Sequence, residues 1–126
     1  MPVLRFYPQE LAGFGYLYLM HGHPDSIQIL PSDRVQISTQ PHDDIVRTWG
    51  EFTDVKCGYH WWTGMHGNDS LYMAVGFGGQ FVVVVSSLSM VIVITADKNC
   101  TLAESGQRQL SLIQLMATQV LAATNR

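Results

Sequence analysis

Apolar and polar residues are arranged most distinctively in the segment 71–97, where the pattern predicts three consecutive strands. The first strand ends in a glycine-rich turn, Gly76–Gln80, and the next two, Phe81–Val85 and Met90–Ile94, contain only apolar residues. A strand without polar alternation has to be covered on both faces of its sheet. Because a short serine-rich turn joins the last two strands, we expect the three to be antiparallel neighbours.

Two short helices are predicted ahead of these strands. The first runs from Pro8 to about Met20, because proline suits the first turn of a helix and apolar residues follow at helical spacing. Its glycines, Gly13 and Gly15, weaken the helix, and they either let another backbone approach closely or keep the helix short. The second helix is expected at Ser32–Thr39, directly after a proline.

The last helix has the clearest start signal. Thr101 and Glu104 are predicted to form a capping box, in which the side chain of each residue accepts a hydrogen bond from the backbone amide of the other. One apolar face follows at helical spacing and can cover one side of the sheet: Leu110, Ile113, Met116, Ala117, Val120 and Leu121.

The middle of the chain carries weaker signals. Gln40 to Lys56 shows no period and is interpreted as a connecting region, Tyr59–Thr63 predicts an aromatic strand, and Met65–Ser70 predicts a turn. The expected fold is therefore α/β of the α+β type, a single domain over residues 1–126, with an antiparallel sheet of about four strands. The C-terminal helix would cover one face, while the short N-terminal helices leave the second cover largely missing.

Composition limits the classes of partner. Hydrophobic residues make up 47% of the 126 residues and charged residues only 13%, whereas about a quarter is usual. The seven Lys and Arg residues form no cluster, so we expect no nucleic-acid partner. The apolar runs, such as Phe81–Val85, are far shorter than the ~20 residues of a membrane helix, so we expect no membrane partner. No signal peptide is visible, which leaves the location open and cytoplasmic by default.

Metal and cofactor signals are weak. His21 and His23 are separated by one residue, but no third ligand lies near them in the sequence, and they are interpreted as loop residues. Cys57 and Cys100 are isolated and are interpreted as buried thiols. We therefore expect no metal and no cofactor.

Four segments of the chain carry a family resemblance. They are Leu11–Leu19, Gln28–Pro31, Tyr59–Gly64, and Gly76–Gln80 with the two apolar strands that follow it. In this order and spacing they resemble the C-terminal part of serine β-lactamase-related hydrolases, a group with class C β-lactamases, related esterases and 6-aminohexanoate-dimer hydrolases. The resemblance implies a partial β-lactamase-like fold and acyl transfer from an ester, an amide or a β-lactam.

The same resemblance implies a site. The family's nucleophile box, Ser-x-x-Lys, and its second box, Tyr-x-Asn, do not occur in these 126 residues. The third box corresponds to Ala74-Val75-Gly76, without the usual Lys or His at its first position. The next residue, Phe77, is implied to give its backbone amide to an oxyanion hole. Further substrate contacts are implied for Ala74, Val75, Gly76, Gly78 and Trp61, although sheet packing is the stronger interpretation of Trp61.

The predicted function is therefore that of a C-terminal segment of a serine hydrolase, truncated before its nucleophile boxes and inactive alone. Its partners would be a small-molecule acyl substrate in the intact enzyme and either an N-terminal complementary fragment or a second copy. The alternative is a non-catalytic interaction or structural module derived from that fold, because both upstream boxes are absent from the sequence. A small ligand-binding domain that uses the aromatic strand is a third interpretation.

Overall fold

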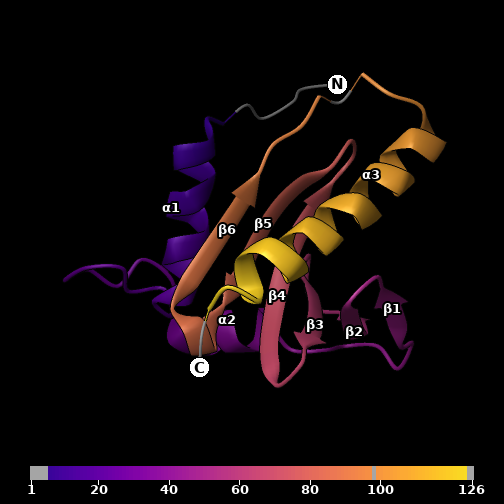
Figure 1. Cartoon of the computed structure of the whole chain (residues 1–126). Coiled ribbons are helices and arrows are strands. Elements are labelled where there is room, and N and C mark those ends of the chain that lie inside the picture. Colours follow the sequence, from indigo (N-terminus) through magenta and orange to yellow (C-terminus); the bar gives the residue numbers. More distant parts are fainter. Residues whose placement is uncertain (1–5, 98, 125–126) are drawn as a thin grey trace.

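The computed structural model describes residues 6–97 and 99–124 and contains one antiparallel sheet with helices on both faces (Figure 1). The six strands lie side by side in chain order: β1 (Arg47–Trp49), β2 (Phe52–Cys57), β3 (Trp62–His66), β4 (Asp69–Gly76), β5 (Gln80–Val85) and β6 (Met90–Ile94). The helices are α1 (Pro8–Leu19), α2 (Ser32–Ser38) and α3 (Leu102–Leu115), and a π-helical turn over Met116–Leu121 follows α3.

Strand β5 is the centre of the packing, because all five of its apolar residues are buried. Successive side chains point to opposite faces of the sheet. Phe81, Val83 and Val85 belong to the hydrophobic core under α3, together with Ile113 and Met116 of the helical segment. The intervening valines of β5 face the other side of the sheet.

Helix α1 covers that second face. A Cβ atom built on Gly15 would lie 2.6 Å from Val91 Cγ1 and 3.1 Å from Val82 Cγ1, so the helix backbone rests directly on β5 and β6. Gly15 was expected either to let another backbone approach the helix closely or to keep the helix short. The structure shows a close approach, although the atoms that come near are those of valine side chains. The expectation that the second cover is largely missing is wrong for β5, whose Val84 is fully buried.

An aromatic cluster extends this cover toward the middle of the sheet. Trp61 is only 3% exposed. Its ring stacks on Phe14 at 5.9 Å between centroids, lies 4.8 Å from Tyr18, and meets Tyr72 edge-on at 5.1 Å. Two residues of α1 and one of β4 thus enclose this tryptophan.

The antiparallel α+β class is confirmed, but the sheet has six strands and the expected connecting region contains two of them, β1 and β2. Phe52 and Val55 are both buried although they are three residues apart. This spacing arises because the pairing of β2 with β3 shifts register between Thr53 and Lys56, where Asp54 has a φ of 53°. A bulge of this kind breaks the two-residue alternation by which strands are recognised.

The predicted aromatic strand and the turn after it are displaced. Strand β3 continues through Met65 and His66, which pair with Ser70 and Asp69 of β4. Only two residues remain for the turn, and the first of them, Gly67, has a φ of 60°. The Gly, Asn and Asp content therefore indicated a turn correctly, but not how short it is.

The predicted helices agree well with the structure. Helices α1 and α2 match their expected ranges to within one residue, and the capping box at Thr101 and Glu104 is present. Of the predicted apolar face of the last helix, Leu110 is 49% exposed, because it lies at the margin of the buried stripe. No helix in the described ranges is long and apolar enough to cross a membrane.

Candidate functional site

The site implied by the family resemblance lies at the turn between β4 and β5. Gly76 pairs with Gln80, which leaves the three turn residues Phe77, Gly78 and Gly79. Gly78 and Gly79 have φ values of 86° and 95°, in the region that favours glycine. A Cβ atom on Gly79 would also lie 2.7 Å from Leu112 Cδ1, so α3 packs directly on this turn.

Three side chains of α3 hold the turn through its backbone. The Gly78 N–H donates to Ser105 Oγ at 2.8 Å, and Ser105 is only 2% exposed. Arg108 Nη1 donates to the Gly78 carbonyl at 3.1 Å, and Gln109 Nε2 donates to the Gly76 carbonyl at 3.2 Å. The turn therefore has a backbone geometry that is fixed by side chains of α3.

The predicted catalytic residue, Phe77, lies at the tip of this turn with its side chain 47% exposed. The Gly78 amide, by contrast, is already engaged by Ser105 and serves the structure. The roles predicted for Phe77, Ala74 and Gly76 therefore remain predictions.

A pocket of about 320 Å³ opens beside β4, between α3 and β1. Val75, one of the predicted substrate contacts, lines it together with Thr48, Trp49 and Gln109. Gln109 also donates to the Gly76 carbonyl, so this side chain connects the pocket wall to the end of β4. Trp61 belongs to the opposite face of the sheet, where it is enclosed by aromatic rings, and its substrate contact stays a prediction.

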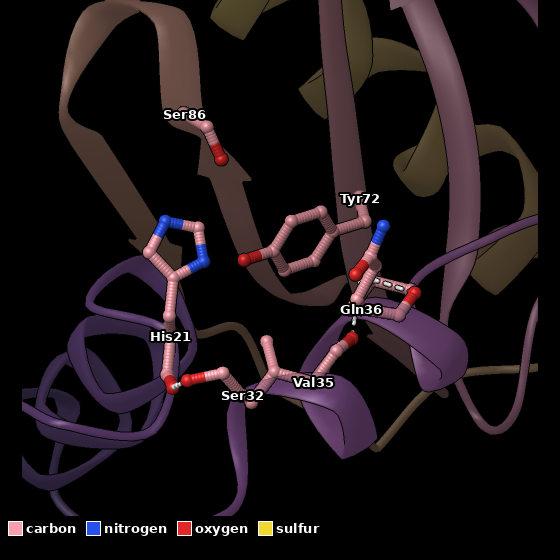
Figure 2. Close-up of a pocket in the computed structure, with 7 residues that line it drawn as sticks. His21, Ser32, Val35, Gln36, Tyr72 and Ser86 are labelled. Carbon is pink, nitrogen blue, oxygen red and sulfur yellow. Dashed lines mark hydrogen bonds between the residues drawn. The ribbon is translucent and has the colours of Figure 1, made fainter.

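A second pocket, of about 410 Å³, lies on the face covered by α1 and α2. Figure 2 shows the imidazole of His21 and the hydroxyl of Tyr72 facing each other across it, with Ser86 close to both. Its lining residues come from four separate segments, so no pattern within one segment could have predicted it: His21, Ser32, Val35, Gln36, Thr39, Tyr72 and Ser86.

The electrostatics of this second pocket keep the Tyr72 phenol protonated. Burial raises the pKa of the Tyr72 phenol to about 12, and a hydrogen bond from Ser86 opposes that rise. At neutral pH the phenol therefore keeps its proton and can donate a hydrogen bond, but it is not a nucleophile. His21 is held in a left-handed backbone conformation with φ of 58°, and the Ser32 hydroxyl donates to its carbonyl at 3.2 Å.

Metal-binding groups are not found together. In the ranges 6–97 and 99–124, no three His, Cys, Asp or Glu side chains lie close enough to hold an ion. His21 lines the second pocket, whereas Cys57 and Cys100 are free and partly buried.

Comparison with known proteins found no family model that matches this chain and no curated protein that is similar to it in sequence. The resemblance to β-lactamase-related hydrolases therefore depends on the four sequence segments alone.

Proposed function

We propose that this chain is the C-terminal sheet segment of a serine hydrolase of the β-lactamase-related group, which acts on esters, amides or β-lactams. The observation that carries the proposal is the turn between β4 and β5. Its backbone is fixed by Ser105, Arg108 and Gln109, while Phe77 lies at the exposed tip. The role proposed for the chain is to present the Phe77 amide to an oxyanion.

Backbone rigidity is what such a role requires. An amide stabilises a developing oxyanion when it is already oriented before the reaction, since no energy is then spent on reorganisation. One donor of this kind contributes on the order of 2.7–4 kcal/mol to acyl transfer. The contribution comes from the main chain, so a phenylalanine side chain at this position is compatible with it.

The remaining chemistry has to come from residues outside this sequence. In the intact enzyme a serine of the missing nucleophile box would attack the carbonyl, and a lysine and a tyrosine would transfer protons. The pocket lined by Val75 and Gln109 lies at the same end of β4 and offers room for part of a small substrate. The chain alone is therefore expected to form no acyl-enzyme.

The test is to sequence and express the reading frame that precedes the codon of Met1 together with this chain. We expect in-frame Ser-x-x-Lys and Tyr-x-Asn boxes, and turnover of a chromogenic ester by the longer protein only. Upstream DNA without either box would contradict the proposal, as would stoichiometric burst labelling of the isolated chain.

The role of the turn has its own test in the longer protein. Phe77→Pro removes the backbone N–H and is expected to lower kcat by about 10²–10³-fold. Phe77→Ala keeps the N–H and is the matched control, with a kcat close to that of the parent. Equal activities of the two variants would exclude the Phe77 amide from the oxyanion hole.

A non-catalytic module remains the second candidate, because a specific observation favours it. Both faces of β5 are buried by helices of this same chain, with Val83 and Val84 fully enclosed. A segment that depends on a missing domain would leave one face open. A sharp, reversible thermal transition of the isolated chain, together with upstream DNA that lacks both boxes, would favour the module.

A further inference from the structure

The two edges of the sheet differ in how they are protected. Strand β1 has only three residues, and its pairing with β2 is irregular between Arg47 and Trp49. Arg47 is charged and forms an ion pair with Asp43 at 3.4 Å. Short length, irregular pairing and charge are the features by which natural edge strands resist the addition of another strand.

Strand β6, at the other edge, has none of these features. Its five residues, Met90–Ile94, are all apolar and each is partly exposed. It pairs with β5 in an unbroken register, without a bulge, and in the described part of the chain no strand pairs with its outer side. An exposed apolar edge of this kind is a template for a further strand.

Helix α1 does not occupy this edge. It meets the sheet through Gly15, which contacts Val82 of β5 and Val91 of β6, two side chains on the same face. The helix therefore lies on the face of the two strands. The backbone groups on the outer side of β6 point within the plane of the sheet, away from β5.

We propose that β6 pairs antiparallel with β6 of a second copy of this chain, about a two-fold axis through Ile92. In this register Ile92 lies opposite Ile92, Val91 opposite Val93, and Met90 opposite Ile94. Every residue of the strand then meets an apolar partner, and cross-strand pairs of this kind stabilise a sheet.

The two-fold register also keeps the two faces of the sheet consistent. An axis perpendicular to the sheet places both α3 helices on one side and both α1 helices on the other. Met90, Ile92 and Ile94, which pack against the core under α3, then join the corresponding residues of the second copy. The partly exposed margin of each core becomes the interior of one continuous sheet.

Charge and symmetry favour a second copy over another partner. Strand β6 carries no charge that would select a different chain, and Asp97, which follows it, would face Ser87 of the other copy if the register continued. No like charges meet along this edge. Because β1 resists strand addition, the pairing closes after two copies and gives a dimer, not a filament.

The decisive experiment is a cysteine cross-link in the full chain. Ile92→Cys is made with Cys57→Ser and Cys100→Ser, and the protein is oxidised mildly. Residues directly opposite each other in an antiparallel pair have Cα atoms about 4.5–5.5 Å apart, which suits a disulfide. We expect a covalent dimer for this variant and none for the matched control, Thr48→Cys, on the opposite edge of the sheet.

A second measurement does not depend on the cross-link. The mass of the parent chain is determined by light scattering from micromolar to near-millimolar concentration, and a dimer is expected. Val93→Lys places two like charges at the edge and is expected to give a monomer whose far-ultraviolet circular dichroism matches that of the parent.

Four outcomes would overturn the proposal: a parent chain that stays monomeric throughout, a dimer that survives Val93→Lys, a dimer without the Ile92→Cys cross-link, or species larger than two copies. A monomer whose β6 amides become protected from hydrogen exchange only when an upstream polypeptide is added would show that another segment occupies the edge. The proposal does not depend on the hydrolase assignment, which is tested by turnover.

Discussion

At the scale of single residues, Tyr72 shows how position decides chemistry. Its ring packs edge-on against Trp61, while its hydroxyl faces the pocket shared with His21 and Ser86 (Figure 2). A phenol in this setting loses its proton less readily than one in water, because burial disfavours the charged form. The same burial links the ionisation of Tyr72 to the stability of the fold.

The stability of the protein is therefore expected to fall at high pH. The pKa of Tyr72 is about 12 in the folded chain, against an ordinary value of 10.0. Between these values the folded state binds more protons than the unfolded state, so the free energy of unfolding decreases as pH rises through this range. Urea denaturation across this range measures the slope.

Two variants separate Tyr72 from other groups that titrate at high pH. Tyr72→Phe is expected to remove part of the slope, because the residue can no longer ionise. Ser86→Ala removes the hydrogen bond that lowers the pKa, so the phenol should titrate at still higher pH. A slope that is unchanged in Tyr72→Phe would contradict the assignment.

At the scale of elements, the sequence predicted what is encoded locally. Helix α3 was recognisable because Thr101 and Glu104 mark its start within four residues. Strands β5 and β6 were recognisable because they are unbroken apolar runs. Strand β2 was missed because a bulge at Asp54 puts Phe52 and Val55 on the same face, a geometry that depends on pairing with β3.

The contact between α1 and the sheet gives a prediction for that helix. Alanine is about 0.8–1 kcal/mol better than glycine in a helix interior. At Gly15, however, the new Cβ would lie 2.6 Å from a methyl group of Val91, whose β-branched side chain adapts poorly. We expect Gly15→Ala to destabilise the fold by about 1–3 kcal/mol, the usual cost of overpacking.

Gly13 is the matched control, since it lies in the same helix and nothing is within 4 Å of a Cβ built there. Gly13→Ala is expected to stabilise the protein by about 0.4–1 kcal/mol. Both free energies come from urea denaturation. If the two substitutions have the same sign, α1 does not rest on Val91 as described.

At the scale of the whole molecule, sequence patterns could not decide which segments cover the two faces of the sheet. The apolar runs of β5 and β6 showed that two covers are needed, but not that α1 folds back to supply one of them. That contact joins the first helix to two strands that lie far from it in the sequence. The second pocket was missed for the same reason, because His21 and Tyr72 meet only after α1 and α2 dock.

If the two faces of the sheet are equally well packed, replacing a large buried side chain by alanine should lower the free energy of unfolding equally on either face. Trp61 lies on the α1 face and Phe81 in the core under α3, and both are almost fully buried. We expect Trp61→Ala and Phe81→Ala each to cost about 3–5 kcal/mol in the free energy of unfolding. Denaturation of the isolated chain checks this, and a small cost for Trp61→Ala alone would mean that this face is completed from elsewhere.

The docking of α1 on β6 also has a consequence during synthesis. The ribosome makes α1 before the strands that it packs on, because Val82 and Val91 lie in the last two strands of the sheet. Since synthesis adds about 5–20 residues per second, the apolar side of the helix stays exposed to water for several seconds. A nascent chain that stops before β6 is therefore expected to expose apolar surface that the whole chain buries.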